Sequence, residues 1–112
     1  MTEQEQAFDF IEIADTDEIH DGDRLVFEID NQPIIIFRAS GKLYAISGVC
    51  SHENESLEDG DLEETKITCP AHGARFDIRD GRVLTLPAVV SLQTYPIREA
   101  DGTIEIGLPL VL

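Results

Sequence analysis

Positive charge is scarce in this chain. Its 112 residues hold 8 lysines and arginines against 23 aspartates and glutamates, so the formal net charge is −15 and the sequence pI is near 4.2. A chain of that sign is repelled by phosphate backbones and by anionic membrane surfaces. The charge balance therefore argues against nucleic acid as a partner.

Long apolar runs are also missing. No uninterrupted aliphatic and aromatic stretch is longer than that of residues 34–37, whereas a membrane-spanning helix needs about 18 to 20 such residues. The first six residues lack the basic flank and the apolar stretch of a secretory signal. We therefore expect no membrane partner and a cytoplasmic location.

Cysteine is limited to Cys50 and Cys69. Disulfides rarely persist in a reducing compartment, so these two side chains are expected to hold a metal or to lie buried. No Pro-rich, Gly/Ser-rich or low-complexity tract marks a domain boundary. With 42% hydrophobic residues, the chain suits a single domain over residues 1–112, which leaves no room for a second enzyme domain.

The order of turns and apolar segments predicts an all-β domain. Asp-Gly and Ser-Gly pairs recur about every twenty residues, and the segments between them are rich in Val, Ile, Phe and Thr. No window of a dozen residues has helical apolar spacing, so only residues 15–19 could form a short helical turn. The expected strands are residues 8–13, 24–29, 34–38, 43–47, 66–68, 75–77, 92–98 and 103–107.

Two segments are expected to be irregular, residues 48–64 and residues 84–91. Within the first, residues 53–64 carry seven carboxylates and no lysine or arginine before the last of them. Such a run is usually a solvated loop. It could also be a docking surface for basic patches on partner proteins, because complementary charge accelerates encounter in a salt-dependent way. The sequence leaves both interpretations open, as it does a local basic rim formed by Arg75, Arg79 and Arg82.

Cysteine and histidine occur together at two places, Cys50-Ser51-His52 and Cys69-Pro70-Ala71-His72, with sixteen residues between the two pairs. Each pair lies within two or three residues, so one turn can aim a thiolate and an imidazole at a single centre. Two facing turns would supply four ligands. A structural zinc site also takes two thiolates and two imidazoles, although zinc modules usually pair Cys with Cys and His with His.

The pattern C-x-H, sixteen residues, C-P-x-H-G resembles the signature of Rieske iron-sulfur proteins. The resemblance implies one [2Fe-2S] cluster per chain, in which Cys50 and Cys69 hold one iron. His52 and His72 would hold the other iron through imidazole nitrogen. The fold that it implies has stacked antiparallel sheets and a small cluster-binding subdomain at about residues 45–90.

Leu86-Pro87-Ala88 resembles the proline loop of that family, which covers the cluster from a third side. High-potential respiratory members place hydroxyl donors two and four residues after the second ligand histidine, where this chain has Ala74 and Phe76. They also carry a disulfide between the cluster loops, at positions that are Glu55 and Ala71 here. The missing hydroxyl donors imply a potential at the low end of the roughly −150 to +300 mV Rieske window, because each donor would stabilise the reduced cluster. These departures point to the ferredoxins of multicomponent oxygenases.

The resemblance thus implies a one-electron carrier without catalysis of its own, the ferredoxin component of a bacterial aromatic-ring-hydroxylating dioxygenase system. Its partners would be a flavin-containing ferredoxin reductase and a terminal oxygenase, and a monomer suits a shuttle. A catalytic Rieske oxygenase would need a further mononuclear iron held by two histidines and a carboxylate, and only His20 is spare. The alternative is a small Rieske subunit of a nitrite reductase or of another multi-subunit oxidoreductase.

Overall fold

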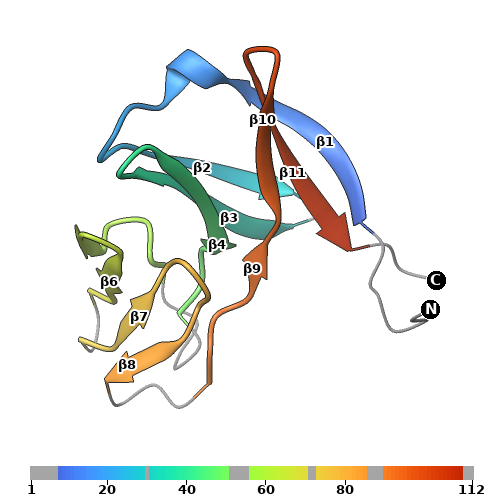
Figure 1. Ribbon diagram of the computed structural model, residues 1–112. Coiled ribbons are helices and arrows are strands. Elements are labelled where there is room, and N and C mark those ends of the chain that lie inside the picture. The colour runs from blue at the N-terminus through green and yellow to red at the C-terminus, as the bar shows by residue number, and fades with distance from the viewer. Residues whose placement is uncertain (1–7, 30, 51–55, 71–72, 86–89, 110–112) are drawn as a thin grey trace, which may run out of the picture.

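The computed structural model describes residues 8–29, 31–50, 56–70, 73–85 and 90–109, and its strands form three antiparallel sheets (Figure 1). The first sheet has the order β1-β11-β10, the second β2-β3-β4-β9, and the third β5-β6-β7-β8. The strands are β1 (Phe8–Asp15), β2 (Arg24–Ile29), β3 (Gln32–Ala39), β4 (Lys42–Ser47), β5 (Asp61–Glu63), β6 (Lys66–Thr68), β7 (Arg75–Asp77), β8 (Val83–Thr85), β9 (Thr94–Tyr95), β10 (Ile97–Ala100) and β11 (Thr103–Pro109).

The expected all-β class is confirmed. Among the described residues the one helical element is a single 3-10 turn, Thr16–Glu18, which lies where a short helical turn was expected. The Glu18 carboxylate accepts a hydrogen bond from the Asp15 backbone N–H at 3.0 Å, which closes the start of this turn. In the same part of the chain, no helix is long and apolar enough to cross a membrane.

The second sheet lies between the other two, and strand β3 shows why. Residues 34–37 are all buried, although a strand on a sheet with one solvated face would alternate. Ile35 and Phe37 point into one core, whereas Ile34 and Ile36 point into the other. Full burial of each such side chain is worth about 1.5–3 kcal/mol. The continuous apolar run is therefore the mark of a strand with a core on each face.

Each core joins the second sheet to one neighbour. The distal core joins it to the first sheet and consists of Ile19, Ile34, Ile36, Ala45, Tyr95, Ile104 and Ile106. The cysteine core joins it to the third sheet and consists of Ile35, Phe37, Ile46, Cys50, Leu57, Ile67, Cys69, Ala74, Phe76, Ile78 and Leu92. In the chain, the third sheet comes between β4 and β9, and Figure 1 shows it below and to the left of the other strands.

Two short strands lie in segments that were expected to be irregular. β5 falls within residues 48–64, and β8 runs into residues 84–91. Both are edge strands of three residues, so neither is long enough to show a period-2 pattern. The expectation was wrong at these two places because β5 and β8 are specified by pairing with β6 and β7 rather than by their own composition.

The segment expected as one strand over residues 92–98 is two strands. β9 pairs with β4 in the second sheet, and β10 pairs with β11 in the first sheet. Pro96 lies between them, and without an N–H it cannot continue a ladder of hydrogen bonds. Its carbonyl oxygen accepts a hydrogen bond from the Gly107 N–H at 2.8 Å. Proline therefore lets the chain cross from one sheet to the next.

Candidate metal centre

The first cysteine lies in a segment whose two ends are joined by a backbone bridge. Cys50 follows the end of β4, and residues 49 and 56 form an antiparallel bridge on either side of it. One step further down, the Leu57 N–H donates to the Gly48 carbonyl oxygen at 2.8 Å. The Gly48 N–H in turn donates to the Pro33 carbonyl oxygen at 2.8 Å. The loop is thus fixed to the second sheet, and His52 belongs to it in sequence.

The second cysteine begins the connection between β6 and β7. The Cys69 N–H donates to the Ala74 carbonyl oxygen at 2.7 Å, and the Gly73 N–H donates to the Cys69 carbonyl oxygen at 3.0 Å. Gly73 has φ of +78°, a conformation that residues with a Cβ rarely adopt. These two hydrogen bonds join Cys69 to Gly73 and Ala74, the described residues that flank Ala71 and His72 in the sequence.

A turn at residues 57–60 joins the two cysteine loops. The Gly60 N–H donates to the Leu57 carbonyl oxygen at 3.0 Å. A Cβ on Gly60 would come within 2.5 Å of the Thr68 carbonyl oxygen, so only glycine allows this approach to the residue before Cys69. The turn therefore contacts the base of the first loop through Leu57 and the start of the second through Gly60.

Cys50 and Cys69 are 2% and 1% exposed, and both belong to the cysteine core. Two loops separated in sequence thus bring two sulfur atoms into one apolar environment, as expected from the sequence. A thiolate is costly to bury unless a cation lies beside it, and thiolate sulfur is the usual protein ligand of iron-sulfur clusters. The pair therefore fits the sulfur side of a metal centre.

His52 and His72 lie outside the described residues, as do Glu55, Ala71 and the segment 86–89 with Pro87. Within the described residues, no group of three His, Cys, Asp or Glu side chains could hold a metal ion. His20 is described, and its side chain is 79% exposed with Nδ1 at 3.5 Å from an Asp23 carboxylate oxygen. It belongs to the turn before β2 and is not part of the cysteine core.

Ala74 and Phe76 are both fully buried in the cysteine core. Ala74 directly precedes β7 and Phe76 lies within it, on either side of the half-buried Arg75. Neither side chain can donate a hydrogen bond. The structure thus places the two positions of interest in the same core as the two cysteines, without a hydroxyl group.

The structure describes only part of the acidic run at residues 53–64. Its described members, Glu58, Asp59, Asp61, Glu63 and Glu64, are all exposed on the turn at residues 57–60 and along β5. Arg75 lies 3.8 Å from Glu63, a long and exposed ion pair. β5 is an edge strand, and charge on an edge discourages pairing with other chains. This acidic face lies directly beside β6, which leads to Cys69.

Asp77 is a buried charge that the sequence did not single out. It is 2% exposed and accepts hydrogen bonds from the Arg79 backbone N–H at 2.9 Å and from Arg79 Nη2 at 2.7 Å. The Arg79 hydrogen bond holds the pKa of Asp77 down at about 2, against an ordinary value of 3.8, and Arg82 at 3.6 Å adds to this. Arg79 and Arg82 therefore form ion pairs with Asp77, and Arg75 forms one with Glu63. The three arginines do not form an unpaired basic rim.

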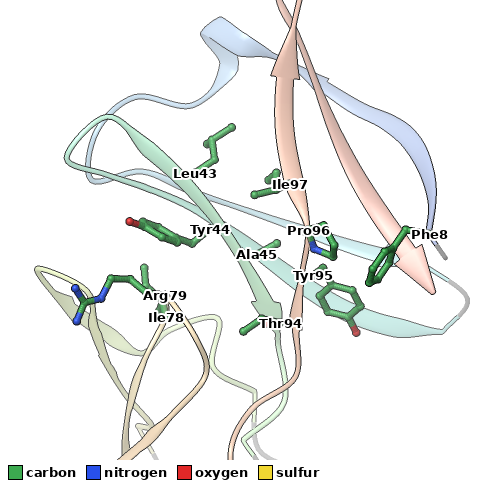
Figure 2. A pocket seen from close by; sticks show the side chains of 10 residues that line it. All are labelled: Phe8, Leu43, Tyr44, Ala45, Ile78, Arg79, Thr94, Tyr95, Pro96 and Ile97. Carbon is green, nitrogen blue, oxygen red and sulfur yellow. The ribbon is translucent and has the colours of Figure 1, made fainter. Parts of the chain in front are cut away.

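A cavity of about 340 Å³ lies apart from the cysteines, where β4, β9 and β10 meet the end of the third sheet (Figure 2). Figure 2 shows Arg79 reaching toward Tyr44 on one side, with Tyr95 and Phe8 on the other. Burial raises the pKa of Tyr95 above its ordinary value. Neither Cys50 nor Cys69 lines this cavity, which is largely apolar and open to solvent. It is not part of the candidate metal centre.

Comparison with known proteins identifies the family. The sequence profile of the Rieske [2Fe-2S] domain matches residues 9–96. The 3-phenylpropionate/cinnamic acid dioxygenase ferredoxin subunit of Escherichia coli strain K12 is 43% identical over 83 residues, which cover 72% of this chain and 78% of that protein.

Two solved structures are similar over nearly the whole chain. The ferredoxin of carbazole 1,9a-dioxygenase from Nocardioides aromaticivorans IC177 has a TM-score of 0.81 and 29% identity, with 87% of this chain and 95% of that chain covered. The ferredoxin of Sphingomonas yanoikuyae B1 has a TM-score of 0.82 and 26% identity, with 90% and 100% covered. These matches confirm the resemblance given by the Cys and His pairs and set the zinc interpretation aside. The chain belongs to the Rieske [2Fe-2S] domain family, among its ferredoxins, and its cofactor is a Rieske-type [2Fe-2S] cluster.

Proposed function

We propose that this protein is the electron carrier of an aromatic-ring-hydroxylating dioxygenase system. It takes electrons one at a time from a flavin-containing reductase and passes them to the terminal oxygenase, and it catalyses no bond chemistry itself. The observation that carries this proposal is the similarity in sequence to a dioxygenase ferredoxin subunit and in structure to the ferredoxin of carbazole 1,9a-dioxygenase, of which 95% is covered. No observation favours a nitrite reductase subunit.

The proposed ligands are Cys50 and Cys69 on one iron. The burial of both sulfur atoms in one core supports this half of the site. We propose His52 and His72 for the other iron, because each follows a proposed ligand cysteine by two or three residues in the sequence. When bound, a cluster with this ligand set is formally neutral in its oxidised state, so it accepts an electron more easily than a cluster with four thiolates.

We propose a single domain over residues 1–112, with a cluster-binding subdomain at about residues 45–90. The position of both cysteines and of the third sheet between β4 and β9 supports these bounds. We also propose a cytoplasmic location and a monomeric carrier. The use of both cysteines as cluster ligands, rather than as a disulfide, suits a reducing compartment.

The test is electron paramagnetic resonance of the reduced, purified protein, followed by rapid mixing. Mixed Cys and His ligation should give a lower average g value than an all-thiolate cluster. The reduced protein should then be reoxidised within a catalytic cycle by the oxygenase of the Escherichia coli dioxygenase whose ferredoxin subunit is similar. Variants His52→Cys and His72→Cys should each abolish the mixed-ligand spectrum. An all-thiolate spectrum in the unaltered protein would overturn the ligand assignment, and a spectrum of Rieske type without transfer to the oxygenase would overturn the carrier role.

A further inference from the structure

Arg24 connects the second sheet to the turn between the two cysteine loops. Its Nη1 donates to the Glu58 carbonyl oxygen at 2.8 Å and to the Gly60 carbonyl oxygen at 2.8 Å. Glu58 and Gly60 lie 34 and 36 positions after Arg24 in the chain. A cationic donor makes a stronger hydrogen bond to a carbonyl group than a neutral donor does. One side chain of β2 thus holds both ends of a turn that lies far along the sequence.

The other side of the guanidinium contacts the cysteine core. Its central carbon lies 5.1 Å from the centre of the Phe37 ring, the residue opposite Arg24 across the β2–β3 pair. Phe37 is fully buried and packs in the same core as Cys50 and Cys69. The attraction between a guanidinium group and an aromatic face fixes the direction in which Arg24 extends. Arg24 therefore reaches the turn from a rigid base.

What Arg24 holds is the junction between the two loops. Leu57, at one end of the turn, donates its N–H to Gly48 at the base of the Cys50 loop. Gly60, at the other end, packs against the Thr68 carbonyl oxygen, one residue before Cys69. A shift of this turn relative to the second sheet would therefore move the start of the second loop relative to the first. Two thiolates that share one iron tolerate little change in their separation.

We propose that Arg24 is a positioning residue for the cluster, one that sets the relative placement of the two cysteine loops through the turn at residues 57–60. This inference rests on the proposed function of the site. It assigns a role to a residue that lies 26 positions before Cys50, outside every motif in the sequence. Arg24 acts through the turn, because its two hydrogen bonds reach the Glu58 and Gly60 carbonyl groups.

The experiment compares Arg24→Met with Arg98→Met in the cluster-loaded protein. Arg98 is a matched control, because it also lies on a sheet strand, covers an aromatic ring (Phe10, at 3.8 Å) and loses the same charge. Its ion pair with Glu105 is in the first sheet, apart from the cysteine core. Cluster loss to a strong iron chelator is followed by the visible absorbance, and the reduced clusters are compared by electron paramagnetic resonance.

We expect Arg24→Met to lose its cluster at least about tenfold faster than the unaltered protein, because this variant lacks both charge-assisted hydrogen bonds to the turn. Its resonance should be broadened, because the two loops no longer hold one separation. Arg98→Met should match the unaltered protein in both measurements. Arg24→Lys keeps the charge and can reach a carbonyl group, so it should recover most of the retention. If Arg24→Met does not fold, Arg24→Gln replaces it as the variant without the charge. Arg24→Lys should then lose its cluster at a rate between those of the unaltered protein and Arg24→Gln.

Equal rates and equal spectra for Arg24→Met and Arg98→Met would overturn the positioning role. So would a faster loss in Arg24→Met with an unbroadened spectrum and no recovery in Arg24→Lys, since that pattern indicates general destabilisation. The proposed function fails in a different way, through the spectrum of the unaltered protein, so the two outcomes are distinguishable.

Discussion

At the scale of single residues, Asp77 shows how this chain uses its few cations. Its carboxylate is buried at the end of β7, and it accepts hydrogen bonds from the Arg79 backbone and side chain. The same residue donates its N–H to the Arg82 carbonyl oxygen and accepts from the Gly81 N–H. Gly81 in turn accepts from Leu92, a member of the cysteine core. The Asp77 side chain thus holds Arg79, and the Asp77 backbone closes the turn after β7.

The depressed pKa of Asp77 makes its contribution to stability depend on pH. Its folded pKa is about 2 and its ordinary value is 3.8, so the contribution is full above about pH 4 and is lost as the pH falls toward 2. The shift corresponds to about 2 kcal/mol, and about half of it should be lost by pH 3. The advantage of the unaltered protein over Asp77→Asn in urea unfolding should therefore shrink over this range. Both proteins carry the same cluster, so acid damage to it cancels in the difference.

Asp80→Asn is the control for this series, because Asp80 lies in the same turn but its side chain is exposed. Its difference from the unaltered protein should stay small and nearly constant from pH 6 to pH 3. A constant difference for Asp77→Asn as well would show that the Arg79 contact does not stabilise the ionised carboxylate.

Ala74 gives a second prediction at this scale. It is fully buried among the core side chains that surround both cysteines, and it has no donor. Ala74→Ser adds a hydroxyl that can hydrogen-bond to sulfur and stabilise the electron-rich reduced state. If that preference is worth about 1.4 kcal/mol, the reduction potential should rise by about 59 mV in voltammetry. Ala45→Ser, in the distal core, should leave the potential unchanged. No rise in Ala74→Ser with an intact cluster would contradict the hydroxyl argument.

At the scale of elements, the sequence predicted strands where composition alone determines them. The strand at 34–38 could be found because its four central residues are apolar, and the structure extends it to Gln32–Ala39. β5 could not be found, because two of its three residues are acidic and only pairing with β6 makes it a strand. The break at Pro96 could have been found from the missing N–H of proline.

In the candidate site too, some residues could be found from the sequence and others only from the structure. The proposed ligands Cys50 and Cys69 were recognised from their spacing, because cysteine is chemically distinctive and each lies in a fixed local pattern with a histidine. Arg24 and Asp77 were not, because arginine and aspartate are common surface residues and their partners lie in other elements or at the end of a strand. The role of Arg24 follows from the packing of the second sheet against the turn at residues 57–60, and that of Asp77 from the local turn that brings Arg79 onto its carboxylate.

Gly60 tests the turn between the cysteine loops as an element. Gly60→Ala would place a Cβ 2.5 Å from a backbone oxygen of β6, which cannot move aside as a side-chain tip can. The turn and β6 must separate, and overpacking of this kind costs about 1–3 kcal/mol. We expect a lower unfolding free energy and faster cluster loss to a chelator. Gly41→Ala is the control, because its Cβ would meet nothing within 4 Å and only its positive φ of +80° adds strain. Similar cluster retention in the two variants would argue against close contact at Gly60.

At the scale of the whole molecule, most positive charge is used internally. Arg38 is paired with Glu99 at 2.9 Å, Arg98 with Glu105 at 2.6 Å, and Arg79 with Asp77 at 2.7 Å. With a net charge of −15, the exposed carboxylates therefore dominate the field that an approaching protein meets. Among the carboxylates that the structure describes, those on the turn at residues 57–60 and on β5 are connected most directly to the cysteine loops.

Whether that acidic face guides partners or is merely solvated can be decided by moving the same number of charges at two places. Glu58→Gln with Asp61→Asn removes two charges beside the cysteine loops, and Asp17→Asn with Glu18→Gln removes two from the 3-10 turn after β1. If the face beside the cysteines meets a basic partner, the first pair should slow reduction by the reductase at least about threefold at low salt, and the second pair should have little effect. The difference should vanish near 0.5 M salt, where charges are screened within about 4 Å. Equal effects of the two pairs at every salt concentration would mean that only net charge matters, and that the acidic run on β5 protects a sheet edge rather than a docking site.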